Sequence, residues 1–376
     1  IAFSASNLNS GNFSTAAPGT GETNFDKDGF TQRSVSLNLR QQVNQRFLLK
    51  ANIQANGNEA GLDNGAFSDA IDNTYHKNSI LMGLGGKLSL AKGEFNFNLS
   101  QNVVKNLFDD RGSITNNKGQ ISQLEAGFNY PLTGFLDLTS GASFKRSATQ
   151  QINPYSARLT ADNDIKSLFT SLFFKTTSGF HAELGGRIND HSQYGQNFTY
   201  TLNPSYVYKD RYKVFVNVSS AYRVPSLYQL FSEYGNLALK PETSRTYEAG
   251  VDLDLLPEKL NLNLSYFKRD ISDVIDFGPV SPNQFGYLNQ NKQNDQGFEF
   301  ELGMKPARWL RVNGFYAYVN GEQTSPAGTA FNLFRRPKNT FGANTGISFL
   351  KSLLLNLTYK FTGERKDYYF DVSFTQ

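Results

Sequence analysis

The residue types that could carry acid–base chemistry are scarce in this sequence, which has three histidines and no cysteine. One histidine lies in Asp190-His191-Ser192, which contains the residue types of a catalytic relay. Successive side chains of a strand point to opposite faces, so these neighbours cannot form a relay by themselves. A hydrolase would instead need His181 or His191 beside a Ser or Asp of a neighbouring strand. The lack of cysteine removes disulfide and thiolate chemistry. We expect that the protein is not an enzyme.

A glycine-rich run at residues 83–87, Gly-Leu-Gly-Gly-Lys, is similar to loops that bind phosphate groups. Such a loop needs a helix after it, but this run lies within an alternating strand pattern and no helix pattern follows. Small residues in a strand mark places where another segment approaches closely. The net charge of +4 is spread without a basic run, so we expect no nucleic-acid partner.

The composition indicates β-structure in a membrane. The 376 residues are 39% hydrophobic and have a mean hydropathy of −0.46, with 32 Phe, 19 Tyr and 32 Gly. No stretch approaches the roughly 18 consecutive apolar residues that a membrane-spanning helix needs. A membrane β-strand escapes this test because only alternate residues face lipid. Aromatic side chains suit strands and the membrane–water interface.

Strict alternation of apolar and polar residues recurs along the chain. Residues 260–266 read Leu-Asn-Leu-Asn-Leu-Ser-Tyr, and the same period appears at 34–39 and 95–100. Residues 251–255 place two aspartates on one face and three aliphatic side chains on the other. Each segment therefore has one apolar and one polar face.

The connections between these segments are of two kinds. Short turns are expected near residues 42–46, 91–94, 131–134, 176–179, 209–211, 256–259, 305–308 and 350–352. Long polar segments are expected near 55–77, 105–119, 147–165, 223–243, 270–295 and 320–337, with a shorter one near 189–196. An outer-membrane barrel has short turns on the periplasmic side and longer loops outside. A soluble β-sandwich has no reason to keep this asymmetry, so the pattern favours the barrel.

The fold class is therefore predicted to be all-β, a transmembrane antiparallel β-barrel formed by one domain over residues 1–376. About 16–18 strands are expected in this sequence and roughly 22 in the complete barrel. Residues 368–374 begin a strand as the sequence stops, and an unpaired edge in lipid would leave backbone groups without partners. We therefore expect the last strands to be missing. Residues 1–5 already alternate like a strand, so we also expect a processed or partial chain without its signal peptide.

The most specific stretch covers residues 220–250. It contains Tyr-Arg-Val-Pro-Ser at 222–226, Gly-Asn at 235–236 and Leu-Lys-Pro-Glu at 239–242. This stretch resembles the barrel hallmark of TonB-dependent outer-membrane receptors. Its two prolines interrupt ladder hydrogen bonding, so the segment must leave the sheet or lie where no N–H is needed.

Further stretches extend the resemblance in the order that the family has them. They lie at residues 187–195, 267–277 and 294–301. Residues 26–30, 333–338 and 363–367 are similar to segments of the cobalamin (vitamin B12) receptor branch. Together these stretches span most of positions 26–370.

The resemblance implies active import of a scarce, bulky nutrient through the outer membrane of a Gram-negative bacterium. Cobalamin is the first expectation and an iron–siderophore chelate the second. The partners that it implies are outer-membrane lipid, the nutrient, and the TonB complex acting through a plug domain that this sequence lacks. A passive porin or structural barrel is the alternative. The missing plug argues mildly for it, whereas the motif around residues 222–242 argues against it.

The outer loops are expected to capture the ligand, because loops on a rigid scaffold carry specificity. Tyr234, Phe285, Tyr287 and Arg335 are the predicted contacts. Acidic side chains on the polar face are expected to hydrogen-bond plug or water. These are Glu248, Asp252, Asp254, Glu299 and Glu301.

No cofactor is required, but the cobalamin branch implies structural calcium held by aspartates of the early outer loops. Asp63, Asp69 and Asp72 are the candidates here. A hard cation needs clustered oxygen ligands. The alternative is that these carboxylates are simply solvated.

Overall fold

The computed structural model describes residues 1–17, 25–65, 67–154, 156–281, 284–289, 292–325, 328–331, 335–349 and 352–366. The strand expected at 368–374, residues 333–334 of one motif and residue 367 of another lie outside these ranges.

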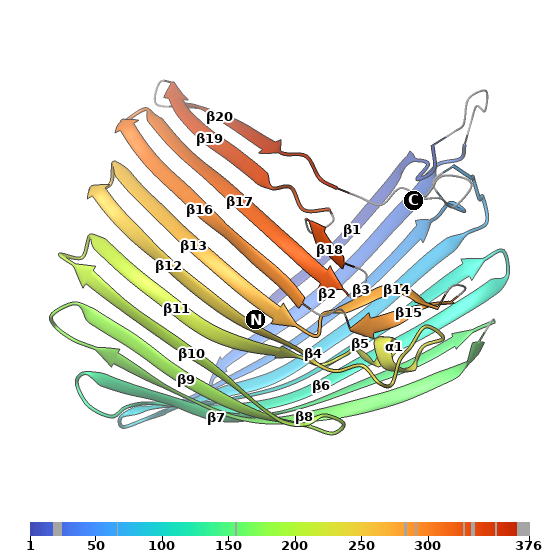
Figure 1. Cartoon of the computed structure of the whole chain (residues 1–376), viewed down its shortest axis with the longest axis horizontal. Helices are drawn as coiled ribbons and strands as arrows, with labels where there is room; N and C mark the ends of the chain where they lie inside the picture. The colour runs from blue at the N-terminus through green and yellow to red at the C-terminus, as the bar shows by residue number, and fades with distance from the viewer. Residues whose placement is uncertain are drawn as a thin grey trace.

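One curved antiparallel sheet of 18 strands makes up almost the whole described chain (Figure 1). The strands are β1 (Ala2–Phe13), β2 (Asp28–Gln42), β3 (Phe47–Gly61), β4 (Thr74–Leu90), β5 (Gly93–Asp110), β6 (Ser113–Pro131), β7 (Leu136–Asn153), β8 (Ser156–Lys175), β9 (Phe180–His191), β10 (Gly195–Tyr208), β11 (Tyr212–Arg223), β12 (Glu242–Leu256), β13 (Leu260–Ser272), β16 (Lys292–Ala307), β17 (Leu310–Ser325), β18 (Gly328–Phe331), β19 (Asn339–Phe349) and β20 (Leu353–Thr362). The hairpin of β14 (Ile275–Ser281) and β15 (Gln284–Asn289) forms a separate sheet. The predicted all-β antiparallel fold is confirmed.

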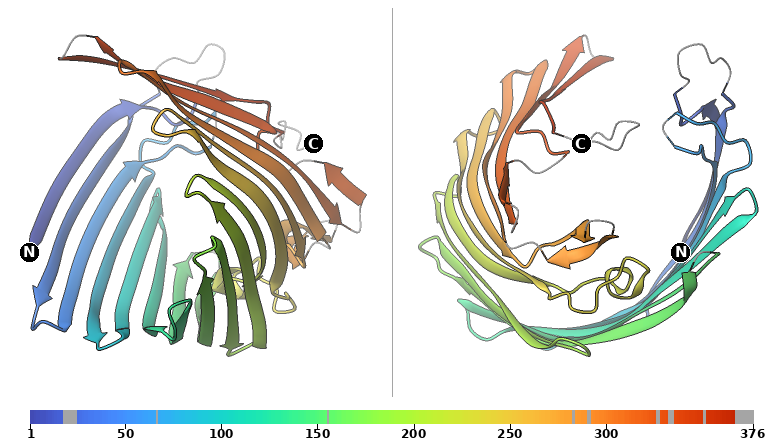
Figure 2. Two further views of the ribbon diagram at one scale, coloured as in Figure 1. Left: turned by 90° about the vertical axis from the view of Figure 1, so that its left-hand side faces the viewer. Right: turned by 45° about the vertical axis from the view of Figure 1, so that its right-hand side comes forward.

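The long strands pair in chain order and bend into a wide arc. In Figure 2, β1 and β20 lie at its two ends, while β14, β15 and the helix α1 (Leu227–Phe231) lie on the concave side. Among the described strands, β1 pairs only with β2 and β20 only with β19. No helix in the described ranges is long and apolar enough to cross a membrane.

The two faces of the sheet differ in polarity, as the alternation predicts. On β4, Ile80, Met82 and Leu84 are exposed on one face. On the other face, Lys87 forms an ion pair with Glu94 of β5. The described residues include few buried apolar side chains, because the apolar face of a membrane barrel packs against lipid.

Several segments that were expected as long loops are strands instead. The β5–β6 ladder continues to the pair Asp110 and Ser113, and the β7–β8 ladder continues to Asn153 and Ser156. Arg111 (φ 50°) and Gly112 (φ 89°) form the tight β5–β6 turn. The loop prediction at 105–119 and 147–165 was wrong because it followed side-chain polarity. A ladder is held by backbone groups, which pair as well in polar sequence.

The glycine-rich run at 83–87 lies in β4, and its neighbours explain its composition. A Cβ at Gly83 would collide with the side chain of Asn52. A Cβ at Gly86 would collide with the rings of Phe97 and Phe47. Residues on β3 and β5 thus fill the space over these glycines, which confirms that the run belongs to the wall.

Gly86→Val should therefore destabilise the barrel by about 1–3 kcal/mol, because the new side chain displaces an aromatic ring from its place. The free energy of unfolding from lipid vesicles in guanidinium measures this effect. Gly119→Val in β6 is the control, since nothing lies within 4 Å of its Cβ position. Equal losses in the two variants would contradict the packing argument.

Candidate functional site

The connection between β11 and β12 leaves the sheet through a short helix. Ser226 caps α1: its side chain accepts a hydrogen bond from the Gln229 N–H, and the Gln229 side chain accepts one from the Ser226 N–H. Such a capping box starts a helix where the strand ladder has ended. The preceding Pro225 is fully buried and has no N–H to donate, so the chain turns away from the sheet here.

The β14–β15 hairpin is tied to this connection by backbone and side-chain hydrogen bonds. The Tyr287 N–H donates to the Tyr234 carbonyl at 3.1 Å, and Asn236 Nδ2 donates to the Tyr287 carbonyl at 3.1 Å. Lys240 N–H donates to Asn289 Oδ1 at 2.9 Å, and Asn289 Nδ2 returns a bond to the Lys240 carbonyl at 3.0 Å. The two outer connections thus form one unit, here called the inner lobe (residues 224–241, 273–281 and 284–289).

The inner lobe has a small apolar core of its own. Leu230, Leu239 and Ile275 are buried against one another, and Tyr194 and Tyr287 pack on them. The Tyr194 hydroxyl, from the β9–β10 turn, donates to the Leu239 carbonyl at 3.1 Å. The core therefore fixes the lobe to a neighbouring hairpin.

Charged side chains of the wall hold the base of the inner lobe. Arg223 forms a two-pronged ion pair with Glu242, and the same carboxylate accepts the Ile275 N–H at 2.7 Å. On the neighbouring strands β13 and β16, Arg269 pairs with the fully buried Asp295. Both carboxylates have cationic partners, so neither is an uncompensated buried charge.

An aromatic cluster projects from the inner lobe. The Phe277 ring lies 5.5 Å from Tyr234, 6.1 Å from Phe285 and 5.2 Å from Tyr287, measured between ring centroids. Tyr228 meets Tyr287 edge-on at 6.1 Å. Phe285 is 54% exposed and Phe277 47% exposed, so these rings offer apolar faces to a ligand.

The structure thus brings together three of the four predicted ligand contacts, Tyr234, Phe285 and Tyr287. Phe277, at the centre, and Tyr228, on the helix, were missed. The aromatic residue at the end of the family-like stretch 267–277 could have signalled the first. The remaining prediction, Arg335, lies beside Lys366, whose carbonyl accepts its backbone N–H at 2.8 Å.

Aspartates of the early outer segments also cluster, but Asp26 takes the place that was predicted for Asp72. Carboxylate oxygens of Asp26, Asp63 and Asp69 all lie within 4.8 Å of one another. Asp72 is exposed and is not in this group. Asp26 belongs to the family-like stretch 26–30, so the signal was present but was not linked to the later loop.

The negative charges of this aspartate cluster repel one another. A hydrogen bond between Asp26 and Asp69, together with burial and repulsion from nearby carboxylates, raises the pKa of Asp26. Burial also acts to raise the pKa of Asp63, but hydrogen bonds from Ser14, Thr15 and backbone N–H groups outweigh it and leave that pKa lowered. One oxygen each of Asp26 and Asp69 is buried without a hydrogen-bond partner among the described residues. The donor set fits a hard cation.

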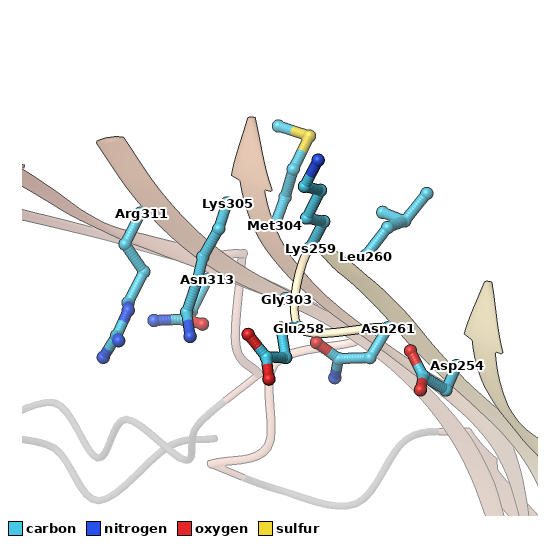
Figure 3. A pocket seen from close by; sticks show the side chains of 10 residues that line it. All are labelled: Asp254, Glu258, Lys259, Leu260, Asn261, Gly303, Met304, Lys305, Arg311 and Asn313. Carbon is cyan, nitrogen blue, oxygen red and sulfur yellow. The ribbon is translucent and has the colours of Figure 1, made fainter. Parts of the chain in front are cut away.

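The concave face at the short-turn end carries charged residues. A cavity of about 260 Å³ is lined there by residues from β12, β13, β16 and β17 (Figure 3). Asp254, Glu258 and Asn261 point to one side of this wall, and Leu260 and Met304 point to the other. The other predicted lumen acids follow the same alternation, and Asp252 pairs with Lys213 at 3.4 Å.

His191 and Ser192, from the run at 190–192, form hydrogen bonds at the β9–β10 turn. His191 is buried, and its Nδ1 accepts the Gln193 N–H at 3.1 Å. The Ser192 hydroxyl accepts the Asp164 N–H at 3.1 Å. These bonds help to hold the β8–β9–β10 edge together, while His191 Nε2 is buried without a hydrogen-bond partner among the described residues.

Three solved structures with the same architecture are a ferric enterobactin receptor, a siderophore receptor and an alcaligin outer-membrane receptor. The ferric enterobactin receptor PfeA of Pseudomonas aeruginosa is 17% identical, with a TM-score of 0.77 over 95% of this chain and 60% of its own. The siderophore receptor PirA of Acinetobacter baumannii is 17% identical, with a TM-score of 0.74 over 91% of this chain and 59% of its own. The alcaligin receptor FauA of Bordetella pertussis is 12% identical, with a TM-score of 0.71 over 90% and 61%. The chain thus spans about three-fifths of their length.

Residues 2–376 match the family described as TonB dependent receptor-like, beta-barrel. Barrels of this family lie in the outer membrane of Gram-negative bacteria, as the alternation and turn pattern predict for this chain. The chain belongs to the TonB-dependent receptor family and forms its outer-membrane β-barrel.

Proposed function

We propose that this barrel captures a scarce, bulky nutrient at its outer end and passes it inward by TonB-driven transport through a plug. The observation that carries the proposal is the inner lobe, which folds onto the concave side and presents the aromatic cluster there (Figure 2). A passive porin keeps a polar, water-filled channel, whereas this lobe exposes the rings of Phe277 and Phe285 there. The lobe therefore favours a receptor over a porin.

Cobalamin is the proposed ligand. It rests on the resemblance of the early and late segments to the cobalamin branch, and on the aspartate cluster that this branch implies. The second candidate is a ferric siderophore. The solved neighbours support it, and so do the flat ring faces of Phe277 and Phe285, which suit an aromatic chelator.

Calcium at the aspartate cluster is part of the proposal. Asp26, Asp63 and Asp69 would hold it, and it would neutralise charge between the segment before β2 and the β3–β4 connection. Asp63 already links these two segments, since it accepts the Ala16 N–H at 2.6 Å and the Ala70 N–H at 3.2 Å. The ion would fix the outer ends of β2 and β3 relative to each other.

Removing the central ring tests the ligand site. In the receptor expressed from its full reading frame, Phe277→Ala should weaken binding of cyanocobalamin by about tenfold, because interface aromatic truncations cost roughly 1–3 kcal/mol. Titration calorimetry measures it, with a ferric catecholate siderophore as the second ligand. Phe180→Ala is the control, since Phe180 is similarly exposed at 44% but lies by a short turn.

If Phe277→Ala weakened binding of the ferric siderophore but left binding of cyanocobalamin unchanged, the ferric siderophore would replace cobalamin as the proposed ligand. Binding of neither ligand by the unaltered receptor, with steady conductance in a planar bilayer, would contradict the receptor function.

Calcium binding should weaken as the pH falls through the raised pKa of Asp26, because the proton and the cation compete for the same carboxylate. Asp26→Asn combined with Asp69→Asn should abolish binding at pH 7 and remove this pH dependence. Equilibrium dialysis with calcium-45 measures both effects. Asp72→Asn, outside the cluster, should bind as the unaltered protein does. Equal loss in that variant would show that the cluster is not the site.

A further inference from the structure

His191 is a buried titratable side chain beside the inner lobe, and the function proposed above does not use it. It is the last residue of β9 and is only 3% exposed. The β9–β10 turn that follows it carries Tyr194, which packs on the apolar core of the inner lobe. His191 therefore lies at the junction between the barrel wall and the lobe.

Hydrogen bonds set the protonation state of His191 that the turn needs. Its Nδ1 accepts the N–H of Gln193 at 3.1 Å and the N–H of Tyr194 at 3.4 Å. A ring nitrogen that accepts such bonds carries no proton, so the imidazole is neutral and its proton is on Nε2. A second proton can bind only at Nδ1, where it would break both bonds and face two N–H groups.

The turn has no second acceptor for these two N–H groups among the described residues. Its other tie to the wall is made by Ser192, whose N–H donates to the Asp164 carbonyl at 2.9 Å. The Ser192 hydroxyl accepts the Asp164 N–H at 3.1 Å. Both of these bonds hold the start of the turn, whereas the imidazole holds the part that presents Tyr194.

Burial opposes the charged form of the ring. It lowers the pKa of His191, and the carboxylate of Asp164 on β8 opposes this effect only in part. The ordinary pKa of histidine is about 6.5. The two bonds to Nδ1 are therefore fully present above that pH, and they are lost as the pH falls towards the lower pKa of the folded state.

The other elements around the ring bring no charge of their own to it. The residues paired with His191 are Ile165 on β8 and Gly195 on β10. Arg187, a cation on the same face of β9, directs its guanidinium to uncharged side chains of β7 and β9. The core of the inner lobe beside the turn is apolar, and its titratable groups are tyrosine hydroxyls. The charged neighbours in the ladder, Lys166 and Asp190, lie on the opposite face.

Tyr194 connects the turn to the aromatic cluster. Its ring centroid lies 5.2 Å from that of His191, and its hydroxyl donates to the Leu239 carbonyl at 3.1 Å. Tyr194 and Tyr287 pack on the same core, and the Tyr287 ring lies 5.2 Å from Phe277 at the centre of the cluster. Movement of the turn would therefore remove one side of the core that supports the ligand-facing rings.

We propose that His191 is a positioning residue: its neutral imidazole holds the inner lobe in the binding arrangement, and protonation of Nδ1 releases the lobe. The proton comes from solvent, and no covalent bond other than N–H forms or breaks. Order in the lobe is then coupled to the pH outside the cell. The effect on the lobe follows from the turn alone, whereas its effect on ligand capture rests on the proposed receptor function.

Hydrogen exchange of the full-length receptor in lipid nanodiscs, without ligand, tests the proposal. Exchange rates are compared at pH 7.5 and pH 5.0 after correction for the chemical effect of pH. Peptides covering residues 192–196 and 234–241 should open roughly tenfold more often at pH 5.0, because each net hydrogen bond shifts an equilibrium by about twofold to twelvefold. A peptide of the wall, residues 95–103 of β5, should not change.

Two substitutions separate the proton from the side chain. His191→Asn keeps an acceptor that reaches the N–H two residues on and does not titrate, so lobe exchange should stay slow at both pH values. His191→Phe keeps a ring beside Tyr194 but has no acceptor, so lobe exchange should be fast at both. His181→Asn is the matched control on the same face of β9 and should keep the pH dependence of the unaltered receptor.

Two outcomes would overturn the proposal. A rise of lobe exchange with acid in His191→Asn, as large as in the unaltered receptor, would show that another group titrates. Slow lobe exchange in His191→Phe at pH 7.5 would show that the turn does not need the acceptor.

Ligand binding tests the consequence for capture separately. Of cyanocobalamin and a ferric catecholate siderophore, the probe that binds at pH 7.5 should bind roughly tenfold more weakly at pH 5.0. His191→Asn should restore this loss, which excludes protonation of the probe itself as the cause. A receptor that binds neither probe at pH 7.5 contradicts the proposed function, whereas failure of the positioning role is seen in the exchange data without any ligand.

Discussion

Pairing of the backbone in lipid is the constraint on which the rest of this structure depends. No water is available in the membrane to satisfy N–H and C=O groups, so each strand must bond to a neighbour along its whole length. The strands reach 20 residues in β8 and 19 in β6, and the β5–β6 ladder runs without a register shift from Glu94–Asn129 to Asp110–Ser113. A regular ladder in turn imposes strict alternation, so one face is left to lipid and the other to the lumen.

The same constraint explains why the functional features lie where the ladder stops. The segment with Pro225 and Pro241 cannot continue a ladder, so it is free to turn inward and form a helix. Its backbone groups find new partners in the β14–β15 hairpin, chiefly through Tyr234, Tyr287 and Asn289. An ordered lobe with its own small core results, and the aromatic rings left over from that core are available to a ligand.

Cations and carboxylates of neighbouring strands pair on both faces of the sheet. On the concave face, cations and carboxylates from neighbouring strands pair with one another, as in Lys213 with Asp252 and Lys175 with Asp137. On the convex face, Arg146 of β7 pairs in the same way with Asp162 of β8, at 3.1 Å.

The sequence by itself determined the fold class and the family. Period-two alternation is a local property of each strand, and the prolines and glycines at the turns mark where strands end, so both can be read without any long-range contact. It also indicated Tyr234, Phe285 and Tyr287, because aromatic residues stood out in loops that leave the sheet.

Only the tertiary structure decided which residues meet. Phe277 joins the three rings through hairpin register, Asp26 replaces Asp72 through the approach of two outer segments, and Tyr194 meets Leu239 where the inner lobe folds onto the β9–β10 turn. Each of these contacts depends on pairing between residues distant in the chain, which side-chain polarity along one segment does not encode.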